Sequence, residues 1–339
     1  MKQMLLITII GLLLTNTPGR ASELFFAELD DFRLENGQVI KDCKIGYRTF
    51  GSLNEQKSNA ILFPTWFGGT SGQLAALIGP GKLIDSTAYF VIAVDALGNG
   101  ISSSPSNSEY QKGDAFPEFS IHDMVRSQHY LVKEVLGIPH LYAIIGGSMG
   151  GMQTFDWVVS YPDFMDKAIP YVGSPQLTSY DLLLFSTQLV LLDMGMRHQL
   201  PVDSLLGAVS SIQMLAAQTP GYFVDKNKRA DFPAYFQNRL TNVSQTFTAM
   251  NYAAQLRAMI NHDIARYFSG DLQRAAAAVK AELLIIVAEQ DHLVNPRPAL
   301  RFAEWMGTHP LILESDCGHL AVSCEMERVV QAIEDFLRH

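Results

Sequence analysis

Short apolar segments alternate with amphipathic helical patterns along most of the chain. Six segments have the β-branched and aromatic composition of buried strands: 60–63, 89–94, 141–145, 168–172, 283–288 and 311–313. Helical patterns lie between several of them. Continuous apolar strands separated by helices predict a mostly parallel sheet with both faces covered, which is an α/β fold.

Local signals mark several element boundaries. Ser120 and Asp123 have the spacing of a capping box, and a helical pattern follows them through residue 136. Asn36-Gly37 predicts a hairpin within residues 24–40. The last segment predicts a helix with one apolar face, made of Met326, Val329, Val330, Ile333, Phe336 and Leu337.

Residues 175–278 interrupt the alternation, because they contain helical patterns and no convincing strand. About 100 residues are too many for a simple connection between two strands. We therefore expect a helical cap over 175–278, inserted into an α/β core made of residues 22–174 and 279–339. Residues 181–193 are nearly all apolar between two aspartates, so they form either a membrane-binding helix or a cap helix that faces a substrate pocket. The cap helix is favoured, and we expect no stable membrane insertion.

Residues 1–21 have the pattern of a signal peptide. Lys2 precedes an 11-residue apolar run at 4–14, and the small residues Gly19 and Ala21 precede a cleavage position at Ser22. A membrane anchor is the alternative, but spanning a bilayer takes about 20 apolar residues. The expectation is a secreted or periplasmic protein.

Composition narrows the function classes. The chain has 339 residues, is 48% hydrophobic and 17% charged, and carries a net charge of −9. An extended disordered state needs far fewer apolar residues. No dense Lys/Arg run suggests a nucleic-acid partner, and no His or Cys spacing suggests a metal site. Cys317 and Cys324 could pair locally, or all three cysteines, Cys43 included, could be buried thiols.

A glycine-rich turn carries the clearest chemical signal. The predicted strand 141–145 runs into Gly146-Gly147-Ser148-Met149-Gly150-Gly151, and a helical pattern follows. G-x-S-x-G between a strand and a helix is a nucleophile elbow, which presents the serine hydroxyl at the edge of the sheet. Ser148 is the candidate nucleophile. The alternative is a glycine-rich turn with a bystander serine.

A nucleophilic serine needs a base and an acid that orients the base. In this kind of fold the chain order is serine, acid, histidine. Asp291 and His319 lie just past two consecutive predicted strands, where open α/β sheets bind ligands. We expect Asp291 to be the acid, ahead of its rivals Glu289 and Asp316.

Two backbone N–H groups must hold the oxyanion. One comes from the residue after the nucleophile, Met149, and the other from the loop after an early strand, where Trp66 is the candidate. Alternatively, Trp66 and Phe67 line the acyl pocket. His262 is a further candidate for a substrate contact, although a surface hydrogen bond to Asp263 is the simpler interpretation.

Several motifs resemble the homoserine O-acetyltransferase family of α/β hydrolases. They are Gly79-Pro80-Gly81-Lys82, Leu97-Gly98, Phe116-Pro117, Leu136-Gly137-Ile138 and, most specifically, the run 146–153. The resemblance implies an α/β-hydrolase fold and a triad of Ser148, Asp291 and His319. It further implies acetyl transfer from acetyl-CoA through an acyl-serine, and a homodimer formed through the cap.

This sequence departs from that family at the acceptor site. The family has an aspartate after the histidine, which holds the amino group of homoserine, and here Leu320 takes its place. No arginine for the homoserine carboxylate is found near residues 212–215. We therefore expect a secreted hydrolase of small-molecule esters that uses no cofactor, with Phe67, Leu320 and His262 as candidate pocket residues. The alternatives are an O-acyltransferase of the homoserine type and, more remotely, a non-catalytic binding protein.

Overall fold

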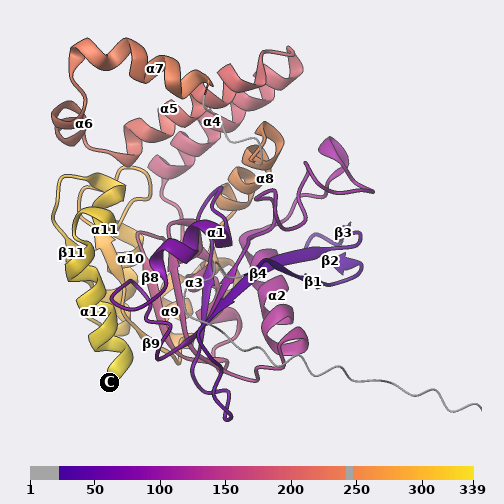
Figure 1. Cartoon of the computed structure of the whole chain (residues 1–339), viewed down its shortest axis with the longest axis vertical. Coiled ribbons are helices and arrows are strands. Elements are labelled where there is room, and N and C mark those ends of the chain that lie inside the picture. The colour runs from indigo at the N-terminus through magenta and orange to yellow at the C-terminus, as the bar shows by residue number, and fades with distance from the viewer. Residues whose placement is uncertain (1–22, 242–246) are drawn as a thin grey trace, which may run out of the picture.

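A nine-stranded sheet forms the centre of the computed structural model (Figure 1), which describes residues 23–241 and 247–339. The predicted signal peptide, 1–21, lies outside the described residues. The strand order is β1-β4-β6-β5-β7-β8-β10-β11, with β9 beside β8. The strands are β1 (Phe25–Glu28), β4 (Lys44–Phe50), β5 (Ala60–Pro64), β6 (Phe90–Val94), β7 (Leu141–Gly147), β8 (Met165–Tyr171), β9 (Glu282–Leu283), β10 (Ile286–Ala288) and β11 (Leu311–Leu313).

Only the edge formed by β1 and β4 is antiparallel, and β6 through β11 pair in parallel. The prediction of a mostly parallel sheet is therefore confirmed. The hairpin predicted at Asn36-Gly37 is also confirmed: β2 (Phe32–Arg33) pairs antiparallel with β3 (Val39–Ile40). Gly37 has a φ of +83°, which glycine adopts without steric cost.

The strand predicted at 283–288 is interrupted between β9 and β10. Both pieces pair with β8 in one register. The hydrogen bonds beside the interruption run from Leu284 N–H to Ala168 O and from Val172 N–H to Ile286 O. Pro170 is the residue of β8 between these two bonds, and the ladder is incomplete because proline has no N–H to donate.

Helices cover both faces of the sheet. Buried side chains of α2 (Ile121–Tyr130), α3 (Met149–Ser160), α9 (Leu272–Ala278) and α10 (Arg297–Met306) form one apolar layer. Those of α1 (Ser71–Leu74), α11 (Ala321–Cys324) and α12 (Met326–Arg338) form the other. The capping box at Ser120 is confirmed, since its hydroxyl accepts the N–H of Asp123 while the Asp123 carboxylate accepts the N–H of Ser120.

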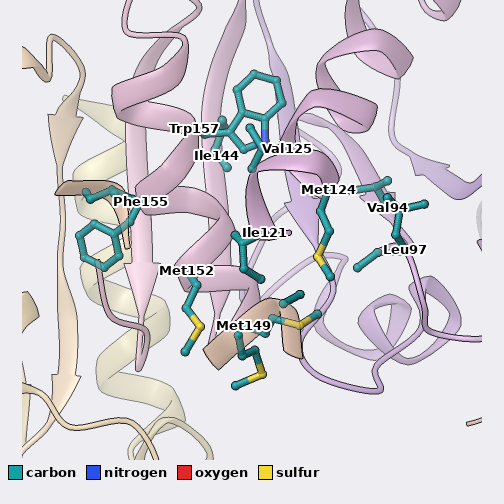
Figure 2. Packing of buried hydrophobic residues seen from close by; sticks show 14 of the residues in the cluster. Val94, Leu97, Ile121, Met124, Val125, Ile144, Met149, Met152, Phe155 and Trp157 are labelled. Atoms are coloured by element: carbon teal, nitrogen blue, oxygen red, sulfur yellow. The ribbon is translucent and has the colours of Figure 1, made fainter. Parts of the chain in front are cut away.

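Every residue of α3 from Met149 to Val159 is buried between the sheet and the neighbouring helices. Figure 2 shows its side chains packed beside Ile121 and Val125 of α2, with Trp157 at one end of the group and Met149 at the other. Phe155 makes an edge-to-face contact with Phe302 of α10, with ring centroids 5.4 Å apart.

The described residues of the segment predicted as a cap form helices joined by turns and short loops, and none of them lies in a named strand. It contains α4 (Ser179–Arg197), α5 (Val202–Ala217), α6 (Pro220–Lys226), α7 (Phe232–Thr241) and α8 (Ala249–Ile260). Figure 1 shows α4 to α7 grouped on one side of the sheet domain. In the described segments, no helix is long and apolar enough to cross a membrane.

The two ends of this insertion lie side by side. Gln176 forms a β-bridge with Asp263, and the N–H of Ile264 donates to Pro175 O at 3.1 Å. The 3₁₀ turn Ile264–Phe268 and α9 then pack on α3 and α10. Residues after this joint therefore belong to the core layer, although the sequence placed them in the cap.

We expect Phe155→Ala to lower the free energy of unfolding by about 3–5 kcal/mol, because it empties a fully buried site against Phe302. Phe26→Ala is the matched control, since the Phe26 side chain is 48% exposed. Urea denaturation followed by far-UV circular dichroism measures both. Equal losses in the two variants would contradict the placement of Phe155 in the core.

Candidate active site

The candidate residues gather where the parallel strands end. Ser148 follows β7, Asp291 follows β10 and His319 follows β11. Because these strands run in parallel, their carboxyl ends share one edge of the sheet. The fold therefore brings together side chains that are up to 171 positions apart in sequence.

Ser148 occupies a strained backbone turn. Its φ is +55° and its ψ is −120°, a conformation that L-residues rarely adopt. The turn is crowded: a Cβ added to Gly146 would lie 2.2 Å from Gly150 O, and one added to Gly150 would lie 2.6 Å from Pro64 O. Both glycines are thus required by close backbone approach, as expected for a nucleophile elbow.

Three side chains form one hydrogen-bonded chain. Ser148 Oγ lies 2.9 Å from His319 Nε2, and His319 Nδ1 lies 2.6 Å from Asp291 Oδ2. The carboxylate accepts from Nδ1–H, so Nε2 carries the lone pair that faces the serine hydroxyl. Asp291 Oδ1 accepts the N–H groups of Leu293 and Val294, each at 2.9 Å, which fixes the carboxylate against the ring.

The rival acids lie elsewhere. Glu289 and Asp316 are both exposed, whereas Asp291 is 5% and His319 9% exposed. A carboxylate that orients an imidazole works best where water does not compete for its hydrogen bonds. Of the three acids, Asp291 is the one in contact with His319.

Backbone N–H groups without a protein partner lie in the two segments that meet at the elbow. Met149 is the first residue of α3, so its N–H has no partner within the helix. In the described part of the chain, the N–H groups of Met149, Trp66 and Phe67 donate to no protein acceptor. The loop after β5 lies directly against α3, as the contact between Gly150 and Pro64 O shows. The arrangement suits an oxyanion hole built from Met149 and Trp66.

Buried polar side chains hold the loop after β5 in place. The Asp95 carboxylate accepts from the N–H and hydroxyl of Ser71 and from Asn99 Nδ2, which also donates to Gly69 O. Burial raises the pKa of Asp95, and these hydrogen bonds act against that effect. From the cap side, Gln255 accepts the N–H of Gly68 at 2.8 Å and donates to Leu97 O.

Comparison with known proteins places the chain in a family. A family model described as the α/β hydrolase fold matches residues 61–323. The chain belongs to the α/β-hydrolase family. It is 31% identical over 330 residues to a Corynebacterium glutamicum protein named "Probable esterase", covering 92% of this chain and 94% of that one.

The relatives of this α/β hydrolase include both hydrolases and transferases. It is 28% identical over 354 residues to a homoserine O-acetyltransferase of Methanococcoides burtonii, covering 91% of this chain and 72% of that one. An acetylester hydrolase from Corynebacterium glutamicum superposes with a TM-score of 0.85 at 25% identity, covering 94% and 96% of the two chains. The fold and the family resemblance predicted from sequence are confirmed, and the chain is an acyl-transfer enzyme of this fold.

Aromatic side chains form part of the hydrolase's cap–core boundary. Phe67 makes edge-to-face contacts with Phe247 and with Tyr252 of α8, at centroid distances of 5.3 Å and 4.7 Å. Phe67, Trp66 and Leu320 are each partly exposed. This exposure is compatible with a ligand contact, and their role as pocket residues stays a prediction.

His262 has a different position. It is 4% exposed, and its Nε2 lies 2.9 Å from Ser174 O, in the loop after β8. Burial lowers the pKa of His262, so the ring is neutral and donates from Nε2. Among the contacts of the described residues, none joins His262 to the triad or to Phe67. It packs at the joint between cap and core, so the interpretation as a surface pair with Asp263 is wrong, and a contact with substrate stays a prediction.

The cysteine alternatives are resolved by a disulfide between Cys317 and Cys324, which enclose His319. Cys43 is free and buried, and burial raises the pKa of its thiol to about 12. Cys43 is thus an unreactive core residue. Within residues 23–241 and 247–339, no cluster of His, Cys, Asp and Glu is arranged to hold a metal ion.

Sequence reasoning missed the residues that hold the oxyanion loop. Asp95 follows strand β6 directly, so its place at the strand end could have marked it as Asp291 was marked. Gln255 lies in an otherwise ordinary helical pattern, and no local signal distinguishes a buried glutamine from an exposed one.

Reduction of the disulfide should destabilise the segment that carries His319. For so short a loop, the entropy of loop closure predicts that the free energy of unfolding falls by about 2 kcal/mol, and activity should fall with it. Thermal unfolding and ester hydrolysis, each with and without TCEP, test this. Cys317→Ala/Cys324→Ala is the control, because it should behave like the reduced protein and ignore TCEP. Equal responses of both proteins to TCEP would contradict the prediction.

Proposed function

We propose that this α/β hydrolase cleaves small acyl esters, acetyl esters foremost, through an acyl-serine intermediate on Ser148. The observation that carries the proposal is the hydrogen-bonded chain from Asp291 through His319 to Ser148. The two N–H groups beside the serine add an oxyanion site. The likeness to an acetylester hydrolase supports the acetyl group as the acyl part.

The geometry accounts for each step. Ser148 Oγ attacks the acyl carbonyl while His319 Nε2 accepts the hydroxyl proton. The N–H groups of Met149 and Trp66 hold the tetrahedral oxyanion, and Asp291 stabilises the imidazolium. The C–O bond to the alcohol breaks as His319 returns its proton to the leaving oxygen. Water, deprotonated by His319, then attacks the acyl-serine. The acyl C–O bond to Ser148 breaks as His319 returns the proton to Oγ, which releases the carboxylic acid and regenerates Ser148.

Water is favoured over homoserine as acceptor because the charged side chains that would bind homoserine are replaced or already bonded. Leu320 stands in place of the aspartate after the histidine. Where the arginine was sought there is a neutral amide, Gln213, which together with Gln188 is hydrogen-bonded to the hydroxyl of Tyr252. Burial raises the pKa of Tyr252, and the nearby charge of Arg239 partly offsets this.

Arg239 itself is engaged. Its guanidinium donates to Ser210 O at 2.9 Å and to Ser211 Oγ at 3.2 Å. A homoserine carboxylate would have to break these bonds before it could pair with this arginine. Transfer to an acceptor remains the second candidate function, since one relative is a homoserine O-acetyltransferase.

We also propose that the mature enzyme is exported. The motivation is the signal-peptide pattern at 1–21, and the Cys317–Cys324 disulfide supports it, because such bonds persist mainly in oxidising compartments. The test expresses the full chain and a chain that lacks residues 1–21, and uses mass spectrometry to find which form occurs in each culture fraction. Recovery of the full-length chain from cytoplasm alone would contradict export.

The decisive assay measures both products at once. Purified enzyme receives p-nitrophenyl acetate with excess L-homoserine, and acetate and O-acetylhomoserine are quantified together. We expect acetate to dominate. Ser148→Ala should abolish both the formation of acetate and the labelling of the protein by a fluorophosphonate. A majority of O-acetylhomoserine would establish the transferase instead, and full activity in Ser148→Ala would contradict both.

Asp291→Asn should lower kcat by about 10⁴-fold, because an amide favours the wrong histidine tautomer. Glu289→Gln, on the same loop but exposed, is the matched control and should retain full activity. Steady-state hydrolysis of p-nitrophenyl acetate measures both. Equal activities in the two variants would contradict the role of Asp291.

A further inference from the structure

We propose that Gln153 is a positioning residue that fixes the oxyanion hole, and that Gln128 and Trp157 orient its side-chain amide. Gln153 Nε2 donates to Thr65 O at 3.0 Å and to Met149 O at 3.1 Å. These carbonyls belong to the two segments that supply the oxyanion donors. The inference rests on the proposed function, and it adds which side chain positions the two oxyanion donors.

The orientation of the Gln153 amide is determined by its neighbours. Trp157 Nε1 can only donate, and it lies 2.9 Å from Gln128 Oε1. Gln128 Nε2 must then face the other way, where it lies 2.5 Å from Gln153 Oε1. This leaves Gln153 Nε2 toward the backbone carbonyls, which can only accept. With a pure donor at one end and pure acceptors at the other, neither amide can flip without losing bonds.

The consequence for the oxyanion hole follows from peptide geometry. Thr65 C=O and Trp66 N–H belong to one trans peptide, so they point in opposite directions. When Gln153 holds the Thr65 carbonyl toward α3, the Trp66 N–H must face away from Gln153. The same Nε2 also binds Met149 O on the first turn of α3. One side chain thereby ties the peptide of one donor to the segment that carries the other.

The chain of amides has no contact with water. Gln153, Trp157 and Thr65 are fully buried, and Gln128 is 1% exposed. Buried amides that lose a partner cannot replace it with solvent, so the arrangement is rigid. Met149, Gln153 and Trp157 recur every four residues on one side of α3. From Met149 to Trp157 the helix rises about 12 Å, so these residues reach from the catalytic edge of the sheet into the packed core (Figure 2).

Gln153→Met tests the role of the amide, because methionine fills similar volume and cannot donate. We expect kcat for p-nitrophenyl acetate to fall by at least about tenfold with KM changed by less than about threefold, since removal of a single oxyanion donor costs about 10²–10³ in kcat. Ser127→Ala is the matched control: it deletes a buried hydroxyl on α2 that donates to Met124 O and, among the described residues, has no bond to the oxyanion loop. Gln153→Met leaves Thr65 O and Gln128 Nε2 without a partner, so it should unfold at a lower temperature than Ser127→Ala, and kcat is compared well below both unfolding transitions.

Gln153→Glu gives a readout that a packing role would not change. A protonated carboxyl can accept from Gln128 and donate to Thr65 O, whereas an ionised one repels both carbonyls. Burial keeps carboxyls protonated to higher pH. We therefore expect activity within about threefold of wild type at pH 6 and at least about tenfold below it at pH 9, where wild type stays active. Trp157→Phe, which removes the orienting N–H, should lower kcat by a few fold.

Three outcomes separate the alternatives. If kcat of Gln153→Met stays within about threefold of Ser127→Ala, and Gln153→Glu follows the wild-type pH profile, the inference is overturned. A fall in kcat for Gln153→Met at unchanged KM supports it, even where Gln153→Glu does not fold. If wild type itself shows no ester hydrolysis and Ser148 takes no fluorophosphonate label, the proposed function has failed first, and this inference with it.

Discussion

Close backbone approach around Ser148 is the constraint on which the rest of the structure depends. A Cβ on Gly150 would collide with Pro64 O, and one on Gly173 would lie 2.8 Å from the Cα of Gly151. These contacts bring the ends of β5, β7 and β8 within van der Waals distance of the start of α3. The surrounding sheet holds Ser148 at its strained φ and keeps the N–H groups of Met149 and Trp66 in position.

Much of this arrangement could be predicted from sequence, because it follows from order and placement along the chain. The six apolar segments correspond to the seven parallel strands, since β9 and β10 share one segment, and polar residues just past them lie at one edge of the sheet. Asp291 and His319 were found in this way. The elbow was evident from the glycines, whose small size is needed for the contacts now seen at Gly146 and Gly150.

The rest depends on which polar side chains are buried, and periodicity does not report that. Gln153 and Gln255 occur in helical patterns that could equally face solvent, and only tertiary packing turns them toward the oxyanion loop. His262 was misjudged for the same reason, since a histidine beside an aspartate has the composition of a surface pair. The end of the cap was misplaced because α9 is helical like the cap but packs on α3 and α10.

The neck at which the cap leaves and rejoins the core bears on how such enzymes diversify. Because Pro175 and Ile264 are directly hydrogen-bonded, the intervening helices form an insertion whose ends need no bridging. Evolution can lengthen, shorten or exchange such a module while the sheet is untouched. Three cap residues are exceptions, because they bond to the loops around the site: Gln255 accepts from Gly68, Asp181 accepts from Asn295, and Thr219 donates to Asp316 O. A graft of a foreign cap onto this core must therefore preserve these three contacts, and natural variation in substrate range should be concentrated in the rest of the cap.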